Sequence, residues 1–431
     1  MNSSPTASIG GRDPLVDAAR ALSVCVVVLF HAGLWRVSLI CNRWEAHTMD
    51  PGPIGWYGSW LLMVMPVFFI AGGFAHGVVI DMMHEHGTGL AHYYANRGRR
   101  LVGPTTVFVT FFAVPSTVAA WCGLLDEAVF VSHNLTKLLW FLVTYLLVVL
   151  LAPVMVWLQD HAARTTFAVL VGTGLVVDLW TMWSGNLDVR YLNLVFVWLA
   201  CHQLGIAHQR GFLRQGSARR AWAAIAVGVA GIAALTHVSF GAMGRWPLPA
   251  IGMGTHWVSN LQPPTTAMTS LALAQTGVLG LLARRDLAVL RRPRVLTVTG
   301  TLNSLLMTIY LWHMPCVVLS FGIGIGLGLV WPSLLPVTTF PPSTLMVALS
   351  LMALVIPRVA RLDLRMVPPL GPRQNGPVAA IALCGLTWAM SAVWRHGLVV
   401  HPSQPRSTLG VLGIWLGSAA LAWSANRPAC P

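Results

Sequence analysis

The sequence has very few charged residues for its length. Only 9% of its 431 residues are charged, whereas 56% are hydrophobic. An ordinary soluble domain is about a quarter charged, and so small a set of charges neither covers a water-facing surface nor keeps a chain disordered. The composition therefore excludes the soluble and disordered classes and indicates a membrane protein.

Several common catalytic and redox signatures are missing as well. The chain contains no GxxxxGK[ST], GxSxG, HExxH or CxxC sequence. Their absence excludes the classes that these sequences mark, namely nucleotide-driven transporters, the common soluble hydrolases and zinc proteases. The seven cysteines are scattered, and most lie in apolar runs, so we interpret them as small core residues and expect no metal site.

Apolar runs of about 20 residues predict membrane-spanning helices. There are twelve such runs, at 15–37, 57–80, 101–122, 137–158, 165–183, 190–208, 220–242, 264–283, 302–330, 343–360, 376–395 and 408–425. We therefore predict an all-α fold, a polytopic transmembrane helical bundle of about 12 spans. The ninth run is long for one span, and its glycine-rich stretch from Gly322 to Gly328 predicts a tilt, a bend or a re-entrant turn.

Basic residues are distributed unevenly around these runs. Counting residues at the ends of runs with the adjoining loops, 19 of the 27 Lys and Arg residues lie in the tails and even-numbered loops and 7 in the odd-numbered loops, and Arg20 lies well inside the first helix. Because basic residues favour cytoplasmic loops, we predict a multi-pass cell-membrane protein with both termini in the cytoplasm. Topology and anionic lipid headgroups account for the net charge of +14, so we expect no nucleic-acid partner.

The first helix carries the most informative ionisable residues, because charge at membrane depth is costly and marks function. It contains Asp17, Arg20 and His31 in DAARALSVCVVVLFHAGLW. A separation of eleven residues leaves a net rotation of about 20° and a rise of about 16 Å, so Arg20 and His31 share one face. The structural alternatives are an arginine that snorkels to the interface and a hydrogen-bonded interhelical histidine.

Other polar residues lie at comparable depth or at the cytoplasmic face. His313 in IYLWHMPC is either a structural histidine or a site residue. Asp178 either has a site role, in which it orients a histidine or binds a substrate hydroxyl, or it pairs with a neighbouring helix. His76 follows a glycine pair that permits close helix packing. Arg97 and Arg99 precede the third span, where they either anchor topology or bind phosphates through the guanidinium fork.

Six segments resemble, in order, motifs of the acyltransferase-3 family of integral membrane O-acyltransferases. RDPLVDAARALSVCVVVLFHAGLW resembles the family's opening helix, with an arginine, ten residues and a histidine. FFIAGGF resembles its second-helix motif, with Ala71-Gly72 where Ser-Gly is usual, and Arg97-Gly98-Arg99 resembles its paired-arginine motif. The other three are WFLVTYLLVVLLAP, SNLQPPTTAMTSLALAQTG and NSLLMTIYLWHMP, which resemble the fourth-helix signature, the eighth-helix region of some members and the late Tyr-Leu-x-His motif.

This resemblance implies transfer of an acyl group, expected to be acetyl, from cytoplasmic acyl-CoA to a hydroxyl of a sugar, glycolipid or glycosylated metabolite. It implies that His31 is the catalytic histidine, and neutral imidazole, with a pKa near 6.5, suits a general base. It implies that Arg20 positions or neutralises the donor and that Arg97 and Arg99 bind it. Acyl-CoA is then a co-substrate, and no bound cofactor or metal is expected.

Three supporting residues and three domains complete the prediction. The supporting candidates are Asp17, Asp178 and His313. We expect a cytoplasmic tail at 1–14, an acyltransferase-like transmembrane domain of ten helices at 15–368, and two additional helices with a tail at 369–431.

Two other function classes compete with the acyltransferase. A transporter or flippase of a polar lipid or metabolite would also bury Arg, His and Asp side chains, but it is expected to show repeated halves, and we find no internal repeat. The third class is a non-catalytic membrane scaffold. The presence of both Arg20 and His31 argues against it.

Overall fold

Helices form nearly the whole of the described structure, as the sequence predicts. The computed structural model describes four stretches of the chain, residues 13–40, 43–241, 244–254 and 258–426. Residues 1–12 of the predicted tail, Cys41 and Cys430 lie outside the described residues. Within the described part, ten helices are long and apolar enough to cross a membrane. The predicted all-α polytopic fold is therefore confirmed.

The difference between ten helices and twelve predicted spans comes from two places. The helical segment Leu125–Ser184 covers two predicted spans, 137–158 and 165–183, which meet at Ala162, a residue with non-helical backbone angles (φ −147°, ψ 40°) inside α6 (Trp140–Ser184). The predicted span 264–283 corresponds to α9 (Thr266–Leu282), a shorter apolar helix. Each predicted run therefore corresponds to helical structure.

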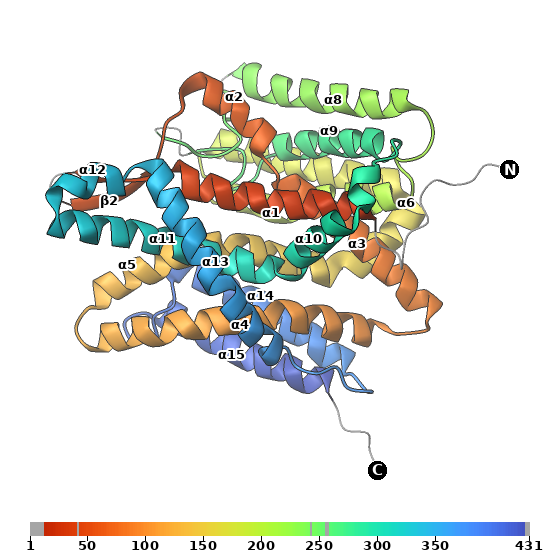
Figure 1. Ribbon diagram of the computed structural model, residues 1–431. Helices are drawn as coiled ribbons and strands as arrows, with labels where there is room; N and C mark the ends of the chain where they lie inside the picture. The colour runs from red at the N-terminus through yellow and green to blue at the C-terminus, as the bar shows by residue number, and fades with distance from the viewer. Residues whose placement is uncertain (1–12, 41–42, 242–243, 255–257, 427–431) are drawn as a thin grey trace, which may run out of the picture. The chain divides into compact units, whose positions relative to one another are not determined.

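The chain forms two compact units, and the first contains residues up to 79, 152–306 and 324–345. Its further elements are α1 (Pro14–Leu34), β1 (Trp35–Ile40), β2 (Arg43–Thr48), α2 (Gly52–Leu62), most of α3 (Met65–Glu85), η3 (Val189–Leu192), α7 (Asn193–Gln209), α8 (Ala218–His237), η5 (Ala288–Arg291), α10 (Pro293–Ser304), η6 (Pro332–Leu334) and α12 (Leu335–Thr338). Helix α9 contacts both α7 and α8. In Figure 1, α8 lies beside α9, and α10 lies beside α1, which it contacts.

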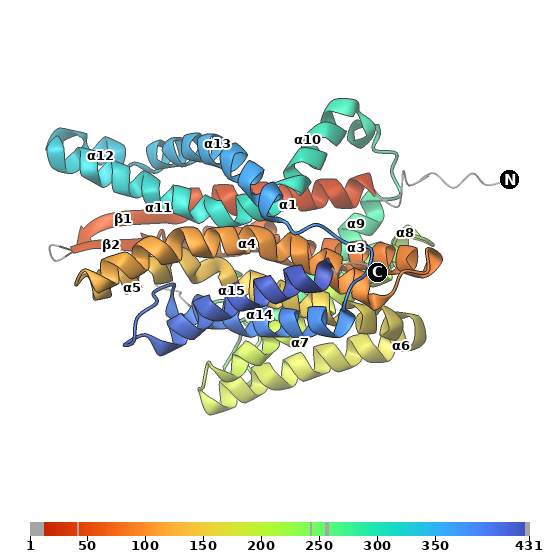
Figure 2. The same cartoon turned by 90° about the horizontal axis from the view of Figure 1, so that it is seen from below.

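The second unit contains residues 80–151, 307–323 and 346–431. Its elements are the end of α3, α4 (Leu90–Trp121), α5 (Leu125–Thr136), η2 (Lys137–Leu139), the start of α6, most of α11 (Leu306–Val330), most of α13 (Pro341–Met366), α14 (Gly376–His396) and α15 (Pro405–Ala425). Helices α14 and α15 contact each other, and both contact α4 (Figure 2).

Helix α1 begins where its sequence supplies a start signal. Asp13 caps the helix, since its Oδ1 accepts hydrogen bonds from the backbone N–H groups of Leu15 (2.9 Å) and Val16 (3.4 Å). Pro14 occupies the first turn, where a missing N–H costs nothing. At its other end the helix stops at Leu34, and the chain continues into the antiparallel β1–β2 hairpin, which the sequence did not predict.

The predicted re-entrant turn at the glycine-rich stretch of span nine does not form. Helix α11 runs unbroken from Leu306 to Val330, and the interruption falls earlier, at Leu305, between α10 and α11. The glycines instead allow the following turn to approach the helix closely. A Cβ atom at Gly324 would lie 2.7 Å from the carbonyl oxygen of Thr338, whose Oγ1 donates to the carbonyl oxygen of Gly324 at 2.8 Å.

Close packing of α3 on α7 agrees with the packing predicted for the glycine pair before His76. A Cβ atom at Gly73 would lie 2.0 Å from the carbonyl oxygen of His202, and one at Gly205 would lie 2.0 Å from that of Ile70. The buried imidazoles of His76 and His202 share a hydrogen bond of 3.0 Å between Nδ1 and Nε2. Glycine on both helices therefore permits the approach that lets two buried polar rings bond each other.

A buried carboxylate, Asp178, joins three parts of the first unit. Its Oδ2 accepts hydrogen bonds from Thr266 through N (2.8 Å) and Oγ1 (2.7 Å) and from Trp246 Nε1 (2.9 Å). Its Oδ1 accepts one from Asn193 Nδ2 at 2.8 Å. Asp178 thus ties α6 to α7, to the start of α9 and to the loop that precedes α9. Of the two predicted alternatives, the hydrogen bonds are those of an interhelical pairing.

Replacing Asp178 is expected to destabilise the first unit. In Asp178→Ala the buried donors on Thr266, Trp246 and Asn193 lose their acceptor, which costs about 3 kcal/mol or more. We expect a clear fall in the Tm of the purified protein in detergent. The Tm is measured as the temperature at which the monodisperse peak in size-exclusion chromatography is lost. Asp188→Ala, at an exposed position, is the matched control. Equal Tm values for the two variants would contradict the role given to Asp178.

Candidate active site

Arg20, the only basic residue that lies well inside a predicted span and not at its end, is held by a residue of α10. Arg20 Nε donates a hydrogen bond to Asn303 Oδ1 at 2.8 Å. The Nδ2 of Asn303 in turn donates to the backbone carbonyl oxygen of Asp17 at 2.9 Å. One amide side chain therefore fixes both the guanidinium of Arg20 and the turn of α1 that precedes it.

His31 lies on the same unbroken helix as Arg20. Helix α1 includes both residues, and His31 falls in its last turn. The imidazole is partly buried and makes an edge contact with Phe30, with ring centroids 6.0 Å apart. Continuous helix between the two residues retains the predicted separation of about 16 Å along one face.

The N-terminal end of α1 is also tied to the loop that follows α7. Asp13, the capping residue, forms an ion pair of 3.0 Å with Arg214. The guanidinium of Arg214 lies over the ring of Phe74 on α3, 5.9 Å from its centroid. Both the charge and the flat face of this arginine are therefore used to fix the start of the helix that carries Arg20 and His31.

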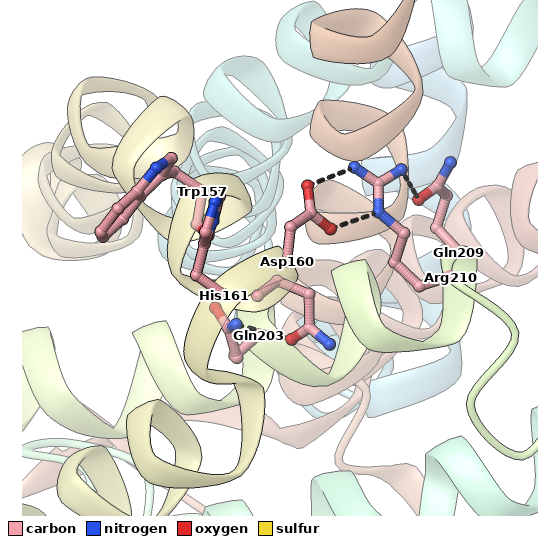
Figure 3. A network of polar contacts seen from close by, with 7 residues as sticks. Trp157, Asp160, His161, Gln203, Gln209 and Arg210 are labelled. Carbon is pink, nitrogen blue, oxygen red and sulfur yellow. Dashed lines mark hydrogen bonds and ion pairs between the residues drawn. The ribbon is translucent and has the colours of Figure 1, made fainter.

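A second arginine near the start of the α7–α8 loop belongs to a polar network between α6 and α7, shown in Figure 3. Arg210 donates to both carboxylate oxygens of Asp160, at 2.9 Å and 3.0 Å, and to Gln209 Oε1 at 2.8 Å. Trp157 stacks on His161 one turn along the same helix, with centroids 4.6 Å apart. The bidentate pair joins the end of α7 to α6 close to the non-helical residue Ala162.

Arg284 is committed to backbone carbonyl groups. It donates to the carbonyl oxygens of Gly216 (2.5 Å) and Leu213 (2.6 Å). Together with Arg210 and Arg214, it shows that much of the basic character around the α7–α8 loop stabilises that loop. These arginines are therefore poor candidates for a ligand site.

Arg97 and Arg99 on α4 have different surroundings. Arg99 donates through Nη1 to the carbonyl oxygen of Pro368 at 2.8 Å, and through Nε (3.3 Å) and Nη2 (3.2 Å) to Asn96 Oδ1. Arg97 is half-buried and makes no hydrogen bond or ion pair to the residues that the structure describes. The paired-arginine segment therefore contains one anchored and one uncommitted guanidinium.

His313, on α11, is completely buried and bonds its own helix. Its Nδ1 donates to the carbonyl oxygen of Tyr310 at 2.7 Å. The hydroxyl of Tyr310 donates to the carbonyl oxygen of Leu138 in η2. Two residues earlier, Thr308 Oγ1 donates to the buried carboxylate of Asp363 on α13 at 2.5 Å. The part of α11 from Thr308 to His313 thus makes polar contacts with α13 and with η2.

The structure groups only some of the predicted site residues. Asp17, Arg20 and His31 share α1 in the first unit, where Asp178 lies in the separate hydrogen-bonded cluster described above, and Arg97, Arg99 and His313 belong to the second unit. No set of three or more His, Cys, Asp or Glu side chains within the described ranges is arranged to hold a metal ion.

Asn303 is the residue that sequence reasoning missed. Its partner Arg20 lies 283 positions away in the chain, so no local spacing connects them. The available signal was its place as the first residue of NSLLMTIYLWHMP.

Comparison with known proteins agrees with the sequence resemblance. A model of the acyltransferase-3 family, described as an acyltransferase domain, matches residues 14–360. The matched region begins with α1 and ends in α13, so it contains Arg20, His31 and Asn303 but leaves α14 and α15 outside. No curated protein and no solved structure gives a match.

Loss of the Asn303 side chain is expected to loosen α10 from α1. Asn303→Ala removes a hydrogen bond to a charged group and one to the backbone, so local opening should become about tenfold more frequent or more. We expect faster tryptic cleavage after the exposed Arg294 in the purified protein, followed by mass spectrometry. Ser304→Ala, which removes a hydroxyl bonded within α10, is the control. Identical cleavage rates in both variants would show that Asn303 does not hold the two helices together.

Proposed function

Since the chain belongs to the acyltransferase-3 family and is a multi-pass membrane acyltransferase, we propose that it acylates a hydroxyl group of a sugar, glycolipid or glycosylated metabolite. The donor in this proposal is cytoplasmic acyl-CoA, with acetyl as the acyl group. The observation that carries it is the placement of Arg20 and His31 on one continuous helix, with Arg20 oriented by Asn303.

His31 serves as the general base in this reaction. A hydroxyl is a poor nucleophile until its proton is removed, and neutral imidazole accepts a proton near neutral pH. The hydroxyl oxygen then forms a bond to the thioester carbonyl carbon while the carbon–sulfur bond breaks. The proton held on His31 passes to the departing CoA sulfur, which leaves the enzyme in its starting state.

Arg20 supplies fixed positive charge on the same helix. A guanidinium has five N–H donors, and one of them, on Nε, is bonded to Asn303 in the described structure. Since that bond sets the plane of the guanidinium, the remaining donors are preorganised to meet an anionic or carbonyl group of the donor.

Arg97 and Arg99 bind the CoA moiety. CoA carries several phosphate charges, and arginine matches phosphate through parallel N–H donors. The cytoplasmic excess of arginine in the sequence supports placing this face, and both termini, on the cytoplasmic side of the cell membrane. The free guanidinium of Arg97 suits direct phosphate contact, whereas Arg99 contributes charge while its position is fixed by Asn96 and Pro368.

Substitution of His31 tests the chemistry. In His31→Ala we expect transfer of radiolabelled acetyl from acetyl-CoA to a glycoside acceptor to fall about 100-fold or more, the usual contribution of a general base. His86→Ala, at an exposed histidine that bonds its own helix, should retain full activity. Equal transfer by wild type and His31→Ala would refute the assignment. If the protein consumed no thioester with any acceptor in a broad panel, transport would become the favoured function. Substrate flux in proteoliposomes would then measure it.

The two α4 arginines should respond differently to removal. Arg97→Ala should raise the KM for acetyl-CoA about tenfold, because a charge-assisted hydrogen bond is lost, with little change in Tm. Arg99→Ala should raise the same KM and also lower Tm, because its anchor to Pro368 is lost.

Arg219→Ala provides the control for loss of one basic charge at an exposed position outside α4. It should leave the KM for acetyl-CoA unchanged. If Arg97→Ala and Arg99→Ala both kept the wild-type KM for acetyl-CoA, neither residue would belong to the donor site.

A further inference from the structure

The chain beyond the family-matched region lies against α4, the helix that carries the arginine pair. Helices α14 and α15 both contact α4 (Figures 1 and 2). Polar contacts fix α15 on α4: Thr106 Oγ1 and Ser418 Oγ lie 2.7 Å apart, and Trp415 Nε1 donates to Thr110 Oγ1 at 2.9 Å. The two additional helices therefore have a defined register along α4.

The residue between the two arginines is packed against both additional helices. Gly98 is buried, and a Cβ atom there would lie 2.9 Å from Leu421 Cδ2 on α15 and 3.0 Å from Leu383 Cδ2 on α14. A side chain at position 98 must displace Leu421 and would press against Leu383. The middle of the paired-arginine motif is thus a point where α4 packs closely against both α14 and α15.

The linker between α13 and α14 holds the next residue. The carbonyl oxygen of Pro368 accepts a hydrogen bond from Arg99 Nη1 at 2.8 Å. One turn further along α4, a Cβ atom at Gly103 would lie 3.2 Å from Val367 Cγ2. Consecutive positions 98 and 99 are therefore both in contact with chain that follows the family-matched residues 14–360.

This linker is itself fastened to the end of α15. Gly371 N donates to the carbonyl oxygen of Ala425 at 2.9 Å, and Asn375 N donates to that of Ser424 at 3.0 Å. The Asn375 side chain then caps α14 by accepting from Val378 N at 3.2 Å. The linker between α13 and α14, α14 and α15 are therefore bonded to one another, and together they contact α4 at Gly98 and Arg99.

We propose that residues 367–425 are a positioning module for the donor-binding arginines, which sets the rotation and height of α4 at Arg97 and Arg99. Residues two apart on a helix differ in direction by about 200°, so Arg97 and Arg99 lie on nearly opposite sides of α4. With Gly98 and Arg99 held by the module, Arg97 is left on the far side of the helix in a fixed direction, available to the CoA phosphates. The inference rests on the proposed donor-binding role of the two arginines.

Overpacking at Gly98 tests the module. Gly98→Val should push Leu421 away, rotate or shift α4, and raise the KM for acetyl-CoA about tenfold while kcat and the acceptor KM change less than about twofold. Adding Leu421→Ala to Gly98→Val provides the missing space and should return the donor KM to within about threefold of wild type. The full-length protein is used throughout, with Tm and monodispersity in detergent measured for each variant.

Two further variants keep the test decisive. Gly231→Ala overpacks α8 against Ser270 Oγ, 2.8 Å from the added Cβ, and should leave the donor KM unchanged. If Gly98→Val does not fold, Gly98→Ala intrudes less and takes its place. An unchanged donor KM, equal changes in all kinetic constants, or no rescue by Leu421→Ala would overturn the module.

Failure of the module can be told apart from failure of the proposed function. If Arg97→Ala raises the donor KM but the Gly98 variants do not, the arginine binds donor without help from residues 367–425. If the Gly98 variants and Arg97→Ala all leave the donor KM unchanged, the donor site itself lies elsewhere and the module falls with it.

Discussion

Polar groups at membrane depth have no water to bond, and this constraint explains the most specific contacts in the protein. Asp178 is buried and accepts four hydrogen bonds from three elements. His76 and His202 bond each other across a contact of two glycine-bearing helices. Arg20 meets the same requirement through Asn303, but with one of its five donors, so solvation by protein leaves the rest of the guanidinium available for chemistry. The degree to which each buried polar group is satisfied therefore separates structural groups from candidate reactive ones.

The same reasoning sorts the arginines, which dominate the charge of the chain. Arg210 and Arg214 are paired with Asp160 and Asp13, and Arg284 is bonded to backbone carbonyl groups, so each stabilises local structure. Basic residues around the α7–α8 loop thus stabilise loop structure first. Arg20 and Arg97 retain free donors within the described structure, so either arginine can engage the polyanionic donor that we propose without breaking an existing contact.

The sequence predicted what depends on local pattern and missed what depends on distant partners. Run length and hydrophobicity located helical structure at every predicted run, although in the described part ten helices and not twelve are long and apolar enough to cross a membrane. The Arg20–His31 relation was also local, since both lie on one helix. By contrast, Asn303 is 283 residues from Arg20, and His202 is 126 residues from His76; neither pairing leaves a spacing to detect. The break at Leu305 was hidden because apolar residues continue across it, and hydrophobicity alone does not report a single non-helical residue between two helices.

Helix association in a bilayer gains little from the hydrophobic effect, since lipid is as apolar as leucine, so position depends on close contact and hydrogen bonds. Glycine is the residue that permits such contact, and Gly98 lies where two other helices reach α4. A charge at the end of a helix is aimed only as accurately as that helix is rotated, and for bidentate phosphate binding a small rotation matters. Close packing at Gly98, between the two arginines, resists rotation of α4 at the place where the proposed donor site depends on it. The C-terminal helices therefore supply what the arginine pair alone lacks, a rigid reference for its orientation.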